Sequence, residues 1–591
     1  MKKPLLKSLS VLSCTLMLGI GGCTTDFTDD PQVPNLADET IGPKTRSLES
    51  AIFNEGAQVW MVPQKDPYTL ANFQQAYENL LSGNTAQPLT RSEIASIADA
   101  DPLKATHYCL KIYPKDEHEQ WQIERMEDVK VAYIPFDYVQ LTEDEIKALP
   151  TTRSASALFP DERRYKVTYS NVETSEGTVP FETYKMPILY AVWPIDKPLP
   201  EELDYEIDYP IFIPSAESVV TLNSGTFLSK DNLRLLENEA INLALGYSPE
   251  LKTRATNSRT NEGELIFHDN EVNYDSPLRG LRIRFQLGSR IWETSTHGDG
   301  YFRIPTDVPG EASYIHEYRH SKWKITPNGS TAPISYNYGL VNQRFQASLY
   351  RHYVTSQRGE CEIHNAACYY YTGEHELHTW SYDDGIRITA CDYKEPGVIG
   401  RTFWGVKPVY IEIYSDEGSL LSNRIGTTLH ELGHFTHYGE RGGAENLDNM
   451  RYVHGLIKES YACYVGWYLT GEYYQSIGYM PSDPTIDLST QAHQGWSRTN
   501  TGQLSHYSPL FVDLVDDYNQ ETMVSERPIE FNPDPISGVP HSVIRQVIGL
   551  TYDWYSLKQQ LEKYIGVYYS WEDYKEFKIP YEYWFRLENQ Q

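Results

Sequence analysis

The sequence is poor in cysteine, in positive charge and in long apolar runs. Its 591 residues include seven cysteines and no Cys-x-x-Cys pair, so a structural zinc knuckle is not supported. After the first twenty residues, no stretch approaches the 18 consecutive apolar residues that indicate a membrane-spanning helix. Lys and Arg number 51 against 81 Asp and Glu, which gives a net charge of −30. A nucleic-acid-binding protein needs a basic surface to neutralise phosphates, so we expect no nucleic-acid partner.

Apolar and aromatic residues are plentiful. The hydrophobic fraction of 40% is enough for packed cores and argues against a largely disordered chain. At roughly 150 residues per domain, the length predicts about four domains. Aromatic residues make up 13% of the chain and 46 of them are tyrosines, which suit wet binding surfaces as well as cores.

The first residues have the pattern of an export signal. Lys2, Lys3 and Lys7 form a basic segment, and the apolar run from Leu9 to Ile20 that follows is too short to span a bilayer. This pattern is typical of a secretory signal peptide, which we place at residues 1–22.

The end of this segment, Ile20-Gly21-Gly22-Cys23, resembles a bacterial lipoprotein signal. The resemblance implies that Cys23 is lipidated and anchors the protein to a membrane, and Thr24 in place of Asp favours the outer membrane. An ordinary signal peptide with a chance cysteine is the alternative. Residues 23–50, rich in Thr, Asp and Pro, are predicted to be a flexible acidic tether.

Export to an oxidising compartment permits disulfide bonds. Five cysteines remain after Cys14 and Cys23, so at least one is free or pairs between molecules. Cys361 and Cys368 are close enough in sequence to bridge a small loop, although sequence alone does not fix the pairing.

The remaining chain is predicted to have three blocks, the first being an α+β accessory region at residues 51–262. Apolar patterning there predicts helices over 70–81 and 231–245, the second with Asp231 as its cap. Runs of apolar residues bounded by turns predict strands over 108–113, 129–136 and 188–193. The acidic cluster at 116–119 is interpreted as a solvated loop.

The second block, residues 263–335, has short alternating strands at 265–267, 281–285 and 301–304. The Gly298-Asp299-Gly300 turn is typical of a hairpin. About 40 residues around this turn resemble the small β-sandwich of carboxypeptidase-regulatory-like domains. The resemblance implies a structural spacer without chemistry of its own.

The third block, residues 336–591, contains the motif His430-Glu431-Leu432-Gly433-His434, an H-E-x-x-H pattern. Histidines four apart on a helix lie on one face and can bind a common Zn²⁺. Zinc lowers the pKa of water toward neutrality, and Glu431 is placed to take the proton. Apolar residues at helical spacing support a helix here, with Ser422 or Asn423 as its cap. The alternative is an amphipathic surface helix with solvent-facing His and Glu.

Two residues compete as the third zinc ligand. Glu459 lies in the middle of an almost unbroken apolar and aromatic pattern at 453–467, where a buried carboxylate is costly unless it is paired or binds a metal. An H-E-x-x-H motif followed by such a helix resembles the gluzincin zinc metallopeptidases. The resemblance implies that His430, His434 and Glu459 are ligands and that Glu431 is the base. Glu440 would be the ligand in a metzincin-like pattern, but the glycine typical of that pattern is replaced by His437.

Further residues fit a peptidase. Residues 409–414 are predicted to form a strand that pairs with an extended substrate backbone, or else a plain core strand. A helix is predicted to open at Gln503, and within it Tyr507 or His506 is a candidate donor of a hydrogen bond to the tetrahedral oxyanion. Plain packing is the alternative for Tyr507.

Taken together, the sequence predicts a multidomain α+β protein. Its N-terminal α+β block and small β-sandwich precede a mainly helical, zincin-like catalytic domain with a small sheet. The predicted function is that of an exported, outer-membrane-anchored zinc peptidase that hydrolyses proteins or glycoproteins. Two alternatives stay open. One is a non-enzymatic surface lipoprotein that binds glycans or proteins, and the other is a zinc amidase acting on cell-wall peptides.

Overall fold

The computed structural model describes most of the chain between residues 59 and 568, with gaps. The described ranges are 59–83, 103–142, 165–167, 171–174, 177–180, 185–214, 230–246, 261–269, 274–304, 308–309, 312–327, 331–340, 351–353, 358–373, 375–377, 385–391, 410–414, 421–441, 453, 455–479, 510–515 and 538–568. The predicted signal peptide, Cys23 and the predicted tether lie outside them.

The described residues form helices and several small antiparallel sheets, which confirms the mixed α+β class. The chain divides into two compact units. Unit 1 draws on Ile266–Leu278 and Tyr353–Gln591, and unit 2 on Glu39–Leu265 and Arg279–His352. Within the described ranges, no helix combines the length and the apolar character needed to cross a membrane. The finer division into three blocks stays a prediction.

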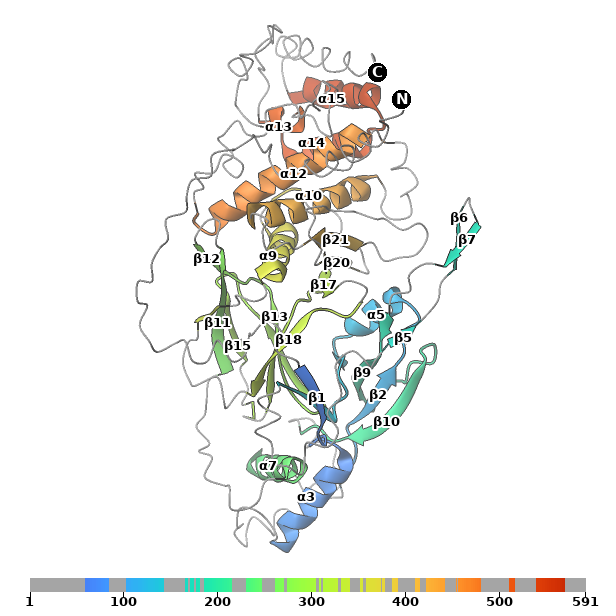
Figure 1. Ribbon diagram of the computed structural model, residues 1–591, viewed down its shortest axis with the longest axis vertical. Coiled ribbons are helices and arrows are strands. Elements are labelled where there is room, and N and C mark those ends of the chain that lie inside the picture. Colours follow the sequence, from blue (N-terminus) through green and yellow to red (C-terminus); the bar gives the residue numbers. More distant parts are fainter. Residues whose placement is uncertain are drawn as a thin grey trace, which may run out of the picture. The chain divides into compact units, whose positions relative to one another are not determined.

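Unit 2 contains a four-stranded antiparallel sheet in the order β10-β2-β9-β3 (Figure 1). Its core is formed by Leu110 and Ile112 of β2, Ala191 and Trp193 of β9, and their neighbours. The bounds of this part are β1 Val59–Pro63, α3 Leu70–Ser82, β2 His107–Ile112, α5 Glu117–Glu124, β3 Lys130–Ala132, β4 Tyr138–Thr142, β5 Tyr165–Val167, β6 Asn171–Thr174, β7 Gly177–Pro180, β8 Lys185–Pro187, β9 Leu189–Pro194, β10 Tyr205–Ile211 and α7 Lys230–Leu245.

The predicted helices at 70–81 and 231–245 are confirmed as α3 and α7, but α7 begins at Lys230, so Asp231 lies inside it. The prediction of a solvated acidic loop at 116–119 is wrong. Asp116 caps α5, its side chain accepting a hydrogen bond from the Glu119 backbone N–H, and Glu117 is buried. The acidic residues at 116–119 mark the start of α5. Carboxylates are favourable there because the first backbone N–H groups of a helix have no partner within the helix.

Apart from β17, the strands of residues 261–340 fall into two sheets. One follows the order β14-β13-β16-β18, and in the other β11 pairs with β15 through its first half and with β12 through its second. The bounds are β11 Asn261–Asp269, β12 Tyr274–Pro277, β13 Arg282–Leu287, β14 Arg290–Ser295, β15 Tyr301–Ile304, β16 Ser313–Glu317, β17 Trp323–Pro327, β18 Ser335–Leu340 and β19 Arg351–Tyr353.

The prediction of a hairpin at Gly298-Asp299-Gly300 is wrong, because the strands on its two sides belong to different sheets. The hairpin lies one turn earlier, between β13 and β14, where Leu287 pairs with Arg290. Gly288 adopts a φ of 54°, and a Cβ there would lie 2.0 Å from an oxygen of Asp66. The turn therefore needs glycine both for its backbone conformation and for this close approach.

Buried charges connect β3 to the β13-β14-β16 sheet and α5 to β17. Arg284 donates to the Val131 carbonyl at 2.7 Å and faces Glu317 at 3.3 Å, and Lys324 lies 3.5 Å from Glu117. Side-chain exposure is 3% for Arg284, 1% for Glu317 and 0% for Lys324. Such buried charges persist only because each faces an opposite charge.

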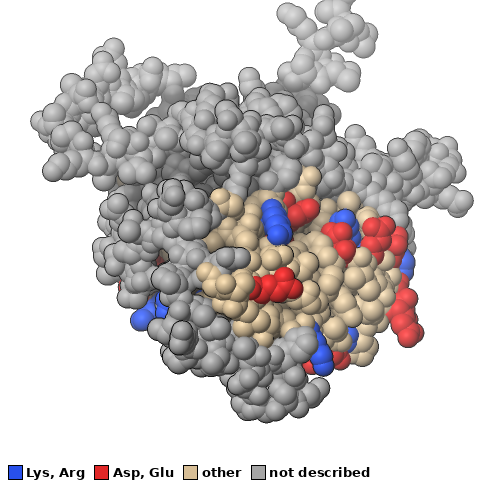
Figure 2. All heavy atoms as spheres, turned by 90° about the horizontal axis from the view of Figure 1, so that it is seen from below, with Lys and Arg blue, Asp and Glu red and all other residues tan. Residues whose placement is uncertain are grey.

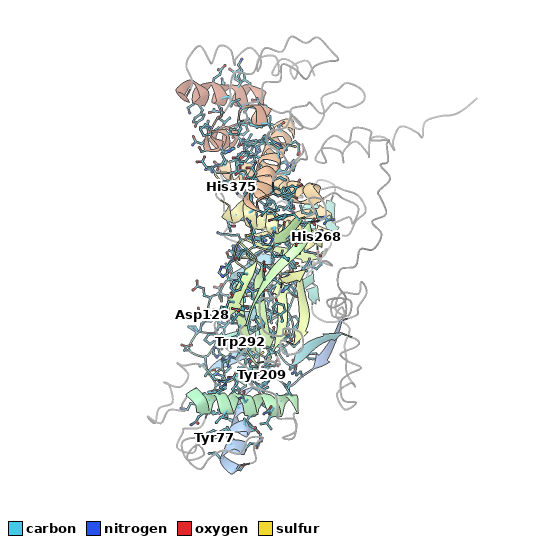
Figure 3. The ribbon with its side chains drawn as sticks, turned by 90° about the vertical axis from the view of Figure 1, so that its left-hand side faces the viewer. Tyr77, Asp128, Tyr209, His268, Trp292 and His375 are labelled. Atoms are coloured by element: carbon cyan, nitrogen blue, oxygen red, sulfur yellow. The ribbon has the colours of Figure 1, made fainter. Side chains whose placement is uncertain are left out.

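The same unit carries the labelled residues Trp292 on β14 and Tyr209 on β10 (Figure 3). Arg290 lies over the Trp292 ring at 4.8 Å, and Tyr209 donates a hydrogen bond to Asp66 at 3.0 Å. On the described part of the face shown in Figure 2, acidic and basic side chains are interspersed among uncharged ones. The overall acidic excess therefore does not gather into one acidic area on that face.

Unit 1 is built mainly of helices. In Figure 1, α9, α10, α12 and α14 lie in successive layers, and α10 contacts each of the other three. Beside them, β20 and β21 pair in parallel. The bounds are α9 Arg358–Thr372, β20 Ile386–Cys391, β21 Tyr410–Tyr414, α10 Leu421–Glu440, α12 Gly455–Ser476, α13 Leu510–Asp513, α14 His541–Gly549 and α15 Trp554–Tyr568.

Cys361 and Cys368 lie on the same helix, α9, and both are buried and form no disulfide bond. Seven residues of helix separate them by about 10 Å along the axis, which is too far for a disulfide bond. The bridge that their sequence spacing allowed is therefore wrong.

Glu293 provides a test of the buried charges in unit 2. Burial raises the pKa of Glu293, but the cations of Arg282 and Arg284 outweigh it and bring the pKa to about 2, below the ordinary 4.5. Ionised Glu293 therefore stabilises the fold above pH 4.5, and this contribution is lost as the pH falls toward 2.

We expect Glu293→Gln to lower the free energy of unfolding by about 2 kcal/mol at pH 7, and the difference to shrink as the pH falls. Urea unfolding followed by tryptophan fluorescence between pH 7 and pH 3 measures this difference. Glu206→Gln, at an exposed position on β10, is the control. A Glu293→Gln deficit of constant size across that range would contradict the prediction.

Candidate metal site

Helix α10 presents the two motif histidines on one face. Its apolar residues Leu429, Leu432 and Phe435 are buried, as the sequence pattern predicts. The rings of His430 and His434 are 4.9 Å apart and perpendicular to each other. The predicted cap is wrong, because α10 begins at Leu421, before both candidates, and runs through Gly439 to Glu440.

Helix α12 brings Glu459 to these histidines. One Glu459 oxygen lies 3.4 Å from Nε2 of His430, and the other lies 3.6 Å from Nε2 of His434. One ligand atom from each of the three residues falls within 4.8 Å of the others, a grouping that could hold a metal ion. The argument that Glu459 is buried was wrong, however, because its side chain is 42% exposed. The cluster therefore opens to solvent on the side of Glu459.

Glycines allow α10 and α12 to approach closely at this point. A Cβ on Gly466 would lie 3.0 Å from the Cβ of His430, and a Cβ on Gly433 would lie 2.9 Å from the Cβ of Val465. Gly466 and Glu459 are seven residues apart, so they lie on the same face of α12 two turns apart. The close approach that Gly466 permits is what places Glu459 within reach of the histidines.

Glu431 lies beside the cluster on the same helix. Its carboxylate is 3.6 Å from Nε2 of His430, and the residue is only 6% exposed. Burial raises the pKa of Glu431 above its ordinary value, although His434 and His430 oppose that shift. A carboxylate with a raised pKa is a better proton acceptor and carrier near neutral pH than an ordinary one.

The same contacts shift the pKa values of Glu459, His434 and His437. Burial tends to raise the pKa of Glu459, but the facing His434 and His430 hold it well below its usual range. Burial tends to lower the pKa of His434, but Glu459 outweighs this and the net shift is upward. Burial, with His434 adding to it, lowers the pKa of His437 well below its ordinary value, so that His437 stays neutral.

Glu440, the competing third ligand, faces elsewhere. Its carboxylate is 2.9 Å from Nε of Arg545 on α14, and it is not a member of the metal-binding group. The helix continues straight through the positions where the metzincin pattern needs a turn. The geometry therefore favours Glu459 over Glu440.

Other predicted residues are only partly covered by the structure. Tyr507, His506 and Cys23 lie outside the described residues, and their roles stay predictions. The strand predicted at 409–414 is confirmed as β21, which packs near α10. The helix predicted from Gln503 is described only as the short α13.

The sequence reasoning missed three features of the site. The glycines of α10 and α12 were a visible signal, because a glycine inside a helix often marks a close contact. Cys463 lies one turn after Glu459, and burial, together with the charges of Glu459 and Glu431, raises its pKa well above the usual range. A buried ion pair between Arg424 and Glu362 joins α10 to α9 at 2.6 Å, and no local pattern indicated it.

Comparison of this chain with protein-family models, with curated proteins and with solved structures finds no match. The metal-binding interpretation therefore depends on the geometry of the described residues.

The two candidate ligands can be separated by metal content. We expect Glu459→Ala to lose zinc, because the two remaining histidines supply too few ligands, and Glu440→Ala to retain it. Elemental analysis of the two purified proteins after dialysis decides between them. Loss of zinc from Glu440→Ala with retention in Glu459→Ala would reverse the assignment.

The close helix approach makes a second prediction. Gly466→Val would push α12 away from His430, and we expect the zinc dissociation constant to rise at least about tenfold. Gly455→Val is the matched control, because Gly455 is the exposed first residue of α12 and has nothing within 4 Å of an added Cβ. Chelator competition gives both affinities, and equal values for the two variants would contradict the role given to Gly466.

Proposed function

We propose that this protein is a zinc-dependent peptidase with its active site at His430, His434 and Glu459. The observation that carries the proposal is the convergence of these three ligand atoms within 4.8 Å, with the carboxylate of Glu431 beside them. Catalytic zinc sites typically combine three protein ligands of these types with an open position. The exposure of Glu459 gives such a position access to solvent and substrate.

The donor set fits zinc. Imidazole nitrogens and a carboxylate oxygen are ordinary zinc ligands. Neither ring nitrogen of buried His430, nor Nδ1 of His434, has a hydrogen-bond partner among the described residues. Buried polar atoms are rarely left in this state, and a bound cation would satisfy Nε2 of His430, which faces Glu459.

Each residue then has a defined task. The ligands would hold the ion, which when bound supplies a Lewis acid that lowers the pKa of water and polarises a carbonyl. Glu431 takes the proton from the attacking water. It then donates that proton to the leaving amine of the cleaved peptide bond. Its raised pKa suits both steps, because the group must accept and release a proton at similar pH.

The substrate is proposed to be a peptide or glycoprotein chain in extended form. Strand β21 lies near α10, the helix that carries the two histidines. An edge strand at this position could pair with a substrate backbone. Tyr507 or His506 would supply the hydrogen bond to the oxyanion. The signal-like N-terminus supports export and a lipid anchor at Cys23 in the outer membrane.

Substitution of the base tests the mechanism. We expect Glu431→Gln to abolish hydrolysis of a general protein substrate while leaving zinc bound, because the variant keeps the shape but cannot take a proton. Cleavage of a labelled casein, with and without a chelator, and elemental analysis measure the two properties.

The same assay separates the proposal from its main rival. Hydrolysis retained by Glu431→Gln would contradict the proposed mechanism. A wild-type protein that binds zinc but cleaves neither proteins nor cell-wall peptides would favour the non-enzymatic binding protein. Chelator-sensitive cleavage of cell-wall peptides alone would favour the amidase.

A further inference from the structure

The metal site depends on the rotation of α10 about its own axis. His430, Glu431 and His434 all come from this helix, while Glu459 comes from α12. A change of one residue in helical register rotates a side chain by about 100°, which would point both histidines away from Glu459. The glycines at the α10–α12 contact set how close the helices come, but a glycine has no side chain with which to fix rotation.

Helix α9 supplies directional contacts to α10. Nη1 of Arg424 donates to an oxygen of Glu362 at 2.6 Å, and the two side chains are 7% and 0% exposed. A charge-assisted hydrogen bond of this length has a narrow range of good geometry. The pair therefore holds α10 in one orientation relative to α9.

A second contact lies beyond the motif. Oγ1 of Thr436 donates to the carbonyl of Leu377, which follows α9 in the chain, at 2.8 Å. The hydroxyl of Tyr370 on α9 also bonds to Thr436. Arg424 and Thr436 are twelve residues apart, or about 18 Å along the helix, and the motif lies between them.

These contacts lie away from the histidine face. At about 100° per residue, Arg424 and Thr436 each project about 120° from the direction of His430, on opposite sides of it. Helix α12 packs against the face of α10 that carries the histidines, and α9 packs against a different face of α10. The α9 side holds α10 through buried hydrogen bonds from Arg424 and Thr436, and α14 holds the C-terminal end of α10 through the ion pair of Arg545 with Glu440.

We propose that Glu362 and Arg424 are a positioning pair for the metal site, holding α10 at the rotation that directs His430 and His434 toward Glu459. The inference rests on the proposed function, because it assumes that the cluster binds a metal. Neither residue is a member of the metal-binding group, so the pair acts through the helix.

Stability alone does not explain this pair. Replacing a buried ion pair with apolar residues of similar volume is often neutral or stabilising, whereas removing one partner is strongly destabilising. We therefore infer that the charged pair serves to fix one orientation of α10 relative to α9. This difference between stability and geometry is what the experiment uses.

The experiment compares three variants of the full chain with wild type. Glu362→Gln weakens the pair, the double variant Glu362→Leu/Arg424→Met replaces it with apolar groups, and Glu440→Gln breaks the ion pair with Arg545 at the far end of α10 as a matched control. The probes are the zinc dissociation constant by chelator competition and the visible absorption spectrum of the Co²⁺-loaded protein. Thermal unfolding of the metal-free proteins reports stability.

We expect Glu362→Gln to raise the zinc dissociation constant about 10- to 100-fold and to alter the Co²⁺ spectrum. The double variant should regain thermal stability without regaining zinc affinity or the wild-type spectrum, and Glu440→Gln should match wild type in both metal probes. The double variant thus keeps the test open if Glu362→Gln folds poorly.

Two results would overturn the inference. The first is wild-type zinc affinity and Co²⁺ spectrum in Glu362→Gln or in the double variant, which would make the pair merely structural. The second is an equal loss of affinity in Glu440→Gln, which would remove any special role of the α9 contact. A wild-type protein that binds neither Zn²⁺ nor Co²⁺ would instead refute the proposed function, and the inference with it.

Discussion

The packing of α10 against α12 is the contact on which the candidate site depends. Two ligands four residues apart on one helix are a local arrangement that any helix provides, but the third ligand must come from elsewhere in the chain. The near-contact of Gly466 with His430 sets the distance between the helices, and Glu459 follows two turns away on the same face. A small change in this contact moves Glu459 relative to both histidines, whereas the spacing of the histidines would survive it.

Buried charges in unit 2 are arranged differently from those of the candidate metal site in unit 1. In unit 2, buried cations such as Arg284 and Lys324 face buried carboxylates, and the result is a closed set of ion pairs with no solvent-facing member needed. In unit 1, the His430–His434–Glu459 group has two histidines facing one carboxylate that is partly open to water. The first arrangement suits a rigid support, and the second leaves the Glu459 carboxylate accessible from solvent.

The sequence was sufficient for the local features and insufficient for those that depend on distant contacts. The helix containing His430 and His434 was predictable from periodicity and spacing, whereas the choice of Glu459 came from the resemblance to gluzincins and from the argument that its carboxylate is buried. The reason given for Glu459 was wrong, because an apolar helix pattern does not show which side of the helix meets solvent. The acidic start of α5 was mistaken for a loop, and the turn at Gly298-Asp299-Gly300 was mistaken for a hairpin. Both errors came from local patterns whose meaning is fixed by the strand or helix that packs next to them.

The position of the ligands along the chain has a consequence for how unit 1 holds together. His434 and Glu459 are joined by the 25-residue segment from the end of one helix into the next, so an ion bound between them closes a loop in the polypeptide. Closing a loop restricts the unfolded chain far more than the folded one, which is the entropic effect attributed to disulfide bonds. In unit 1, Cys361, Cys368 and Cys463 form no disulfide bond. A metal ion bound at His430, His434 and Glu459 would therefore act as a cross-link in unit 1, and the proposed metal site would also stabilise the fold around it.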